Sequence, residues 1–498
     1  SAKIDQYKFK HFDSGLFWET NVGKTYKHAD SAYEQLLKQL SNVKSRLIKE
    51  AGEEHATLVK KILMMLILIK YLEERVDDEG NSALNPYEFY KSYCPDSPTL
   101  SSVLENAALF IRMLDDLSSK NHFNGHVFYL SEHEKHTLTN QIDLSLFQYF
   151  VEGNVEFTAS GRDGIGQGTL WRLYQFNYLP IELISHIYED FLVDIRGDKK
   201  KGVVYTPPSL VQLLLDQTMP LSDPKEDFKV LDPACGSGIF LVGAYKRMIQ
   251  WWRLQNNWAR PAKENIEELK GLLKNNIYGC DIEDEAVTLT YFSLSLALLD
   301  ALSPKEIWEN VHFDDLRETN LFSDDFFQPL TDNKLPVDFQ LIIGNPPFKS
   351  ELTNIAAEVN KNEKENYTNR PNLPDNQIAL LFLEQSMKLL AQEGNCCMIM
   401  PAGPLLYNQS SHPFKKYLLG QFHAKYIYDF IALRTKLFNG SGAKPAVVSV
   451  VLEKNGDFNQ PTTHFILRRT NASGEKIEFE IDYYDIHHLP YDLVLNNP

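Results

Sequence analysis

The spacing of apolar residues divides the chain into an N-terminal helical part and a longer part in which strands and helices alternate. Up to about residue 180, apolar residues recur three and four positions apart, which places them on one side of a helix. Two such stripes are clearest: Leu36, Leu37, Leu40, Val43 and Leu47, and then Leu58, Ile62, Leu63, Leu66 and Ile69. We predict that both stripes pack into a core, and we find no catalytic cluster in this third of the chain.

A further helix is predicted over Leu179–Leu192. Pro180 suits the first turn of a helix, and one face of this helix is apolar, with Ile181, Ile184, Ile187, Tyr188 and Phe191. The basic stretch that follows, from Gly197 to Gly202, is expected to be a loop.

The pattern then changes to short apolar runs that alternate with helical stretches. The segments in chain order are Phe228–Asp232, Ile239–Trp251, Ile277–Asp281, Ala286–Leu299, Phe339–Gly344, Ile378–Ala391 and Cys396–Pro401. Such alternation is typical of a parallel sheet with helices on both faces. We therefore predict a doubly wound, mainly parallel α/β domain over residues 179–455, preceded by a helical domain over residues 1–178.

The last part of the chain is predicted to be rich in strands. Tyr426–Ile431 and Val447–Leu452 are expected to form a hairpin at the sheet edge. Beyond residue 456, Phe465–Arg468 and Ile477–Tyr483 also have the composition of strands. We expect residues 456–498 to begin a separate β-rich module, of a kind that could recognise DNA.

Composition and charge narrow the class of protein. The chain has 498 residues, of which 43% are hydrophobic and 23% charged, as in ordinary globular proteins. Its longest apolar run, Ile62–Ile69, is far too short to span a bilayer, and no leader peptide opens the chain. The formal net charge of −17 counts against a broad phosphate-binding surface, although a cleft can still be locally basic. Because the chain starts Ser1-Ala2 without methionine, we expect it to be part of a longer protein.

The cysteines indicate a reducing compartment. Five occur, an odd number, and none forms a C-x-x-C pair: Cys94, Cys235, Cys280, Cys396 and Cys397. This pattern argues against a disulfide framework and against a zinc site. The fourteen histidines show no metal-binding spacing, so we expect a cytoplasmic protein without a metal.

The first motif with chemical content is Val230–Gly238 (VLDPACGSG), where an apolar strand runs into a tight glycine turn before a helix. Ligands bind above such strand ends, and Gly236 and Gly238 let a ligand approach the backbone closely. The pair Asp232-Pro233 distinguishes this turn from a generic one. The third glycine of dinucleotide-binding proteins and the Lys-Ser/Thr of a phosphate-binding loop do not follow.

A second motif, Tyr278–Ile282, ends the next predicted strand with Asp281. An acid at that place can accept both hydroxyls of a bound ribose. Asp281 lies 43 residues beyond Gly238, more than usual, because the polar insert Trp251–Asn275 intervenes. A helix N-cap is the alternative role for Asp281, and we favour ribose binding.

The third motif, Ile343–Phe348 (IGNPPF), directly follows a strand that is predicted to be buried. Pro346 and Pro347 remove backbone donors and stiffen the turn, which leaves carbonyl groups free to accept hydrogen bonds. Asn345 adds a side-chain acceptor and Phe348 an aromatic face. Taken alone, the motif is also compatible with a proline-rich turn and a packed phenylalanine.

Together these motifs resemble those of the N6-adenine and N4-cytosine amino methyltransferases, over residues 180 to about 455. The order of the motifs is similar to the gamma arrangement, which is most often adenine-specific. The resemblance implies S-adenosylmethionine as cofactor, duplex DNA as substrate and transfer of methyl to adenine N6. The cofactor-binding residues that it implies are Tyr205, Thr206, Pro207, Asp232, Pro233, Ala234, Gly236, Gly238, Asp281, Ile282 and Asp314, with Asp315 as the alternative register for Asp314. The implied catalytic residues are Asn345, Pro346, Pro347 and Phe348, and Phe348 and Phe438 would stack on the target base.

The N-terminal helical part with Leu179–Leu192 resembles modification subunits of type I restriction–modification systems and their single-chain type II relatives. This resemblance implies as partners a specificity or restriction subunit, or further domains of the same chain. Residues 1–180 contain no Pro-Asp…Glu-x-Lys set in a strand context, so we predict no nuclease there. We expect no membrane partner.

In the implied mechanism the adenine is extruded from the duplex, at a cost of a few kcal/mol. The Asn345 side chain and the Pro346 carbonyl accept the two N6 hydrogens, which frees the nitrogen lone pair for attack on the sulfonium methyl. Three alternatives stay open: a methyltransferase acting on RNA or protein glutamine, an N4-cytosine DNA methyltransferase, and a non-enzymatic DNA-binding protein with a degenerate fold.

Overall fold

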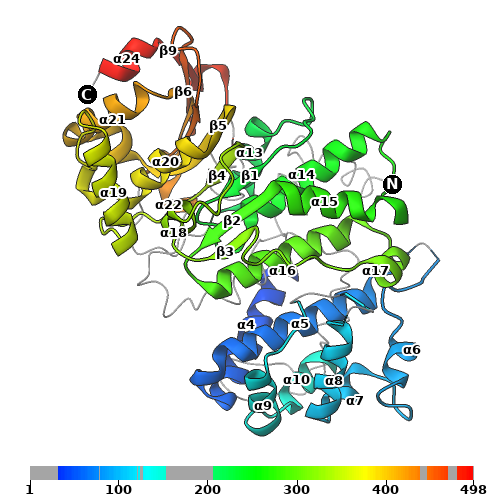
Figure 1. Cartoon of the computed structure of the whole chain (residues 1–498). Coiled ribbons are helices and arrows are strands. Elements are labelled where there is room, and N and C mark those ends of the chain that lie inside the picture. Colours follow the sequence, from blue (N-terminus) through cyan, green and yellow to red (C-terminus); the bar gives the residue numbers. More distant parts are fainter. Residues whose placement is uncertain are drawn as a thin grey trace, which may run out of the picture. The chain divides into compact units, whose positions relative to one another are not determined.

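The computed structural model describes residues 32–77, 79–119, 122–123, 127–152, 206–437, 446–468, 479 and 481–496. The chain divides into two compact units (Figure 1). One comprises Ser1–Leu117 and Phe128–Phe191, and the other comprises Ser118–Val127 and Leu192–Pro498. The helix predicted over Leu179–Leu192 lies outside the described residues.

The described part of the first unit is built from helices. They are α4 (Ala32–Ala51), α5 (Ala56–Glu74), α6 (Pro86–Lys91), α7 (Leu100–Leu104), α8 (Ala107–Leu117), α9 (Glu132–Asn140) and α10 (Ser145–Glu152). Helix α5 is the core of this unit, because every residue from Ile62 to Ile69 is buried. A helix that is apolar on all sides is stable only when it is surrounded by protein. The core role predicted for its stripe is therefore confirmed.

The second unit contains a nine-stranded sheet with the order β3-β2-β1-β4-β5-β7-β6-β8-β9. The strands are β1 (Val230–Asp232), β2 (Ile277–Asp281), β3 (Leu321–Ser323), β4 (Phe339–Gly344), β5 (Leu390–Pro401), β6 (His423–Asp429), β7 (Val447–Glu453), β8 (Thr462–Ile466) and β9 (Ile486–Leu489). Strands β3, β2, β1, β4 and β5 are parallel to one another. This confirms the predicted α/β class with a mainly parallel sheet.

Beyond β5 the sheet contains both parallel and antiparallel strand pairs, and two expectations about this part were wrong. The predicted hairpin forms, since β6 pairs antiparallel with β7. It does not lie at the edge, because β7 also pairs with β5, and β6 also pairs with β8. The segment beyond residue 456 supplies β8 and β9 to the same sheet instead of opening a separate one. The physical reason is that the open edge of β6 has unpaired backbone groups, which β8 satisfies.

The described helices of the second unit lie before, between and after these strands. They are α13 (Pro208–Thr218), α14 (Ile239–Gln255), α15 (Ile266–Asn276), α16 (Asp284–Ala301), α17 (Pro304–Asn310), α18 (Phe327–Thr331), α19 (Asn354–Asn366), α20 (Ile378–Leu389), α21 (His412–Leu419), α22 (Arg434–Leu437) and α24 (Tyr491–Asn496). Among the described helices, none combines the length and the apolar character that a membrane crossing needs.

The strand order reverses between β1 and β4, and this reversal positions the site. From β1 the chain proceeds through α14 to β2 and through α16 to β3, whereas from β4 it proceeds through α20 to β5 in the opposite direction. Because such crossovers are right-handed, the helices of the two halves cover opposite faces. A crevice is expected where the order reverses, outside the carboxyl ends of β1 and β4. The glycine turn and the Asn345 turn both begin there.

Candidate active site at the carboxyl edge of the sheet

The glycine turn after β1 is held in a conformation that exposes its backbone. Gly236 and Gly238 have φ of 53° and 81°, in the left-handed region that favours glycine. Gly238 is the N-cap of α14, and a methyl group added to it would lie 2.7 Å from Cγ2 of Thr290. At Gly236, by contrast, an added methyl group would meet no atom within 4 Å. The turn therefore has open space beside Gly236.

Asp281, at the end of β2, bridges to this turn. Its Oδ2 accepts the backbone N–H of Gly236 at 2.9 Å, and its Oδ1 accepts that of Glu283 at 3.0 Å. The N-cap residue of α16 is Glu283 itself, so Asp281 stabilises the turn that leads into this helix. Ile282 is 64% exposed beside it. The edge thus combines an acid with an exposed apolar side chain.

The Asn345 turn lies directly against the glycine turn. A methyl group added to Gly344 would come within 2.5 Å of Oδ1 of Asp232 and 3.4 Å of Cδ of Pro233. Only a residue without a side chain allows this approach of β4 to the end of β1. The structure therefore brings together the two turns that are far apart in the sequence.

Thr206 connects the predicted cofactor segment to the Asn345 turn. Its buried hydroxyl accepts a hydrogen bond from Nδ2 of Asn345 at 3.1 Å. With the nitrogen of the amide held on this side, the oxygen is the end that can accept from a substrate amine. Pro207, next to Thr206, is also buried and caps α13.

Asp232 is 1% exposed and accepts the backbone N–H of Ala234 at 3.0 Å. Burial raises the pKa of this carboxyl to about 8; the hydrogen bond from Ala234 opposes the shift, and the nearby charge of Asp281 adds to it. Burial also raises the pKa of Asp281, partly offset by its two backbone hydrogen bonds.

No lysine or arginine in the described part of the chain neutralises these two acids. Buried carboxylates are costly unless they are paired with a positive charge. Two such groups, Asp232 and Asp281, beside an open glycine turn therefore suit a cationic ligand.

A model of the N-6 DNA methylase family matches residues 180–484, more than half of the chain. The chain belongs to this family. The type II methyltransferase M.BstVI of Geobacillus stearothermophilus is 29% identical over 270 residues, which are 53% of this chain and 44% of that protein. The type II restriction enzyme and methyltransferase RM.BcgI of Heyndrickxia coagulans is 24% identical over 271 residues, 54% of this chain and 34% of that protein.

Among solved structures, the methyltransferase subunit of a type I restriction–modification system from Streptococcus thermophilus aligns with a TM-score of 0.52. The alignment covers 93% of this chain and 92% of that one at 13% identity, which shows a shared fold. The chain spans less than half the length of the two curated methylase relatives described above.

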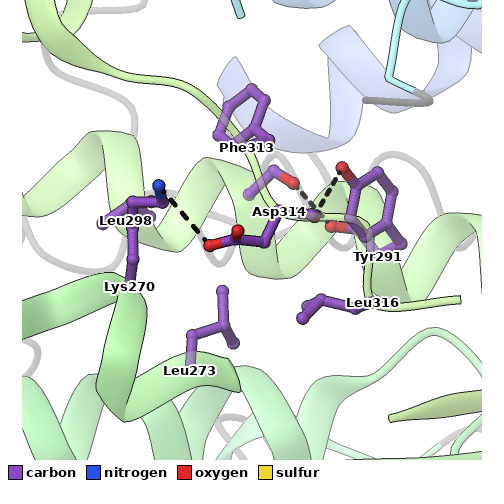
Figure 2. Close-up of a pocket in the computed structure, with 8 residues that line it drawn as sticks. Lys270, Leu273, Tyr291, Leu298, Phe313, Asp314 and Leu316 are labelled. Atoms are coloured by element: carbon purple, nitrogen blue, oxygen red, sulfur yellow. Dashed lines mark hydrogen bonds and ion pairs between the residues drawn. The ribbon is translucent and has the colours of Figure 1, made fainter. Parts of the chain in front are cut away.

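One residue predicted for the methylase site lies elsewhere. Asp314 precedes β3 and lies against α15, where its carboxylate is 3.5 Å from Nζ of Lys270 and 3.8 Å from that of Lys274. Its carbonyl accepts the Tyr291 hydroxyl at 3.1 Å. Figure 2 shows this small pocket, which is lined by Lys270, Leu273, Tyr291, Ser295, Leu298, Phe313, Asp314 and Leu316. Asp314 is therefore not brought together with the two turns, and the alternative Asp315 also precedes β3.

The sequence reasoning missed the acid that follows β3. Ser323 pairs with Asp281 across β2 and β3, so Asp324 extends from the same edge as Asp281. Asp324 is exposed, whereas the Asp325 carboxylate accepts the Thr353 hydroxyl and the N–H of Phe327. A regularity in the sequence could have revealed it, because an acid ends or directly follows each of the first three strands.

Of three further residues predicted for the site, the structure describes Phe348 but not Tyr205 or Phe438. Phe348 is half-buried and packs against the core of this unit. Tyr205 and Phe438 lie outside the described residues, so their roles stay predictions. Leu437, next to Phe438, is buried at the end of α22.

Proposed function

We propose that this chain is the catalytic part of a DNA methyltransferase that transfers methyl from S-adenosylmethionine to adenine N6. The observation that carries the proposal is the contact between Gly344 and Asp232. This contact supports the proposal because the Asn345 turn lies directly beside the buried carboxyl of Asp232, to which no lysine or arginine of the described residues is paired. The family match supports the same activity.

The residues present fit S-adenosylmethionine, which carries positive charge on its sulfonium and its ammonium. Asp232 would supply negative charge for that ligand, Asp281 would accept from the ribose hydroxyls, and Ile282 would pack on the adenine ring. Asp324 would accept from the adenine amino group in place of Asp314. When bound, the cofactor supplies an electrophilic methyl group.

The Asn345 turn would prepare the target amine. The Asn345 amide oxygen and the Pro346 carbonyl accept the two N6 hydrogens, which removes the lone pair from conjugation with the ring. Thr206 holds the amide in the required orientation through its hydrogen bond to Nδ2. The protein's main contribution is to position the two reactants, because the displacement itself needs little acid or base assistance.

The target base would be extruded from the duplex, which costs a few kcal/mol. Stacking of the extruded base on an aromatic ring returns roughly 1–3 kcal/mol, and Phe348 and Phe438 are the rings that we propose for this role. We also propose a cytoplasmic location and, as partners, a specificity or restriction subunit or further domains of the same chain.

The decisive experiment expresses the full-length gene in a host that lacks adenine methylation and maps the modified bases. N6-methyladenine at a defined sequence is the expected result, and Asn345→Ala should abolish it while S-adenosylmethionine still binds. Labelled-methyl transfer to DNA, RNA and protein in parallel separates the alternatives. Methylated cytosine, RNA or glutamine, or an active Asn345→Ala protein, would refute the proposal.

A further inference from the structure

The edge of the sheet at which the Asn345 turn lies continues beyond β5 along β7, β6, β8 and β9. Strands β6 and β8 run parallel to β5 and β4, so the carboxyl ends of all four lie at this edge. Backbone hydrogen bonds join the ends: Ala402 donates to the carbonyl of Ala446 at 2.9 Å, and Leu467 donates to that of Asp429 at 3.0 Å. The edge beyond the Asn345 turn is therefore one continuous surface.

Tyr407 is exposed on this surface in a defined orientation. It ends a one-turn π-helix, Gly403–Tyr407, that follows β5. Its hydroxyl donates to Oδ2 of Asp429 at 3.1 Å, while Oδ1 of Asp429 accepts the N–H of Ile431 at 2.8 Å. The residue is nevertheless 49% exposed. Asp429 thus fixes the hydroxyl end of an aromatic side chain that is about half exposed.

Arg468 and Tyr484 form a second flat group on the same surface. Arg468 follows β8, and Tyr484 precedes β9, which pairs antiparallel with β8. The Arg468 guanidinium forms an ion pair with Asp485 and lies 4.9 Å from the centroid of the Tyr484 ring. Tyr484 is 50% exposed and its neighbour Tyr483 is 86% exposed. Asp485 thus holds Arg468 in place, as Asp429 holds Tyr407.

We propose that Tyr407, Arg468 and Tyr484 form a surface that binds the DNA flanking the extruded nucleotide. The inference rests on the proposed function, because the surface shares its edge with the Asn345 turn. From β4 to β9 the sheet spans five strand spacings, roughly 24 Å.

The chemistry of the surface suits bases that have lost a stacking neighbour. Tyrosine rings and guanidinium planes stack on exposed base faces regardless of sequence. Asp485 is paired with Arg468, and Asp429 and Asp482 accept hydrogen bonds from the hydroxyls of Tyr407 and Tyr484. Binding by stacking also agrees with a chain whose net charge of −17 offers little attraction to phosphates.

The test measures steady-state methylation of genomic DNA from a host without adenine methylation, with the full-length protein. Tyr407→Ala and Tyr484→Ala are each expected to raise the KM for DNA about tenfold. The kcat, the affinity for S-adenosylmethionine and the thermal midpoint should be unchanged. Tyr407→Phe keeps the ring and should stay within about twofold of the wild type, since the stacking face is retained.

Trp258→Ala is the matched control. Trp258 is 53% exposed, and its ring centroid lies 5.6 Å from the Arg253 guanidinium. Unlike the proposed surface, however, it follows the end of α14 at the opposite edge of the sheet. An unchanged KM for DNA in both alanine variants would overturn the surface proposal, and so would an equal rise in Trp258→Ala. A rise that accompanies a loss of thermal stability or of cofactor affinity would show a structural role and would also overturn it. If the wild type methylates no DNA at all, the proposed function itself fails, which is a different result.

Discussion

Proton release on cofactor binding is the most specific consequence of the buried Asp232. Its pKa of about 8 in the free protein means that the carboxyl is largely protonated at pH 7. A cationic cofactor binds the ionised form more tightly, so binding at pH 7 should expel close to one proton. Below the pKa, each unit of pH should then weaken the observed affinity about tenfold.

Calorimetry in buffers of different ionisation enthalpy counts the released proton directly. Between pH 7.5 and pH 6 the Kd for S-adenosylmethionine should rise roughly twenty-five-fold in the wild type. Asp232→Asn should bind more weakly at pH 7.5 but with little dependence on pH. Asp338→Asn is a matched control, because this carboxylate lies on the surface in an ion pair with Lys229 at 2.7 Å. It should keep the wild-type slope.

The same shift predicts how pH affects the stability of the cofactor-free protein. Because the folded-state pKa of Asp232 is raised above its ordinary value of 3.8, its contribution favours folding at low pH. That contribution is lost as pH rises from 3.8 toward about 8, by about 1.4 kcal/mol per unit between these two values, and no more is lost above about 8. A flat Kd between pH 6 and 7.5, with no proton released at pH 7, would refute the reasoning, since it would mean that Asp232 is already ionised in the free protein.

Three further substitutions test other parts of the unit. Asp281→Ala should weaken S-adenosylmethionine binding in a direct titration; an unchanged Kd would leave this residue only its role in the turn. Gly344→Ala would place a methyl group 2.5 Å from Oδ1 of Asp232 and should cost about 1–3 kcal/mol of unfolding free energy, measured in urea; a wild-type midpoint would contradict this contact. Glu384→Gln should lower the unfolding free energy by about 3–5 kcal/mol, because the fully buried Arg370 guanidinium loses the carboxylate that it contacts at 2.6 and 2.7 Å. A loss below 1 kcal/mol in the same urea assay would show that water or another group compensates.

The local sequence pattern alone was sufficient to predict the strands and the helix that surround the site. The strands β2 and β4 have the predicted bounds Ile277–Asp281 and Phe339–Gly344, and α20 begins at Ile378 as predicted. Each begins with apolar residues and is bounded by turn or polar residues, so its type depends little on distant contacts. The motifs after β1, β2 and β4 could be predicted for the same reason.

Other features depended on contacts between residues far apart in the chain. Strand β3 is three residues long, too short to show a period, and so the acid after it was missed and Asp314 was chosen. The lateral position of β7 between β5 and β6, and the addition of β8 and β9 to the same sheet, depend on which backbone edges remain open after the first strands have paired.

The sequence by itself therefore determined which segments we propose for the chemistry: a glycine turn that ends in Gly238, an acid at Asp281 and a rigid turn at Asn345. Only the tertiary structure decided that Gly344 lies against Asp232 and that Thr206 holds Asn345. The reason is that a motif is a local property of the chain, whereas burial and the resulting shift in the pKa of Asp232 arise only when β1 and β4 become neighbours.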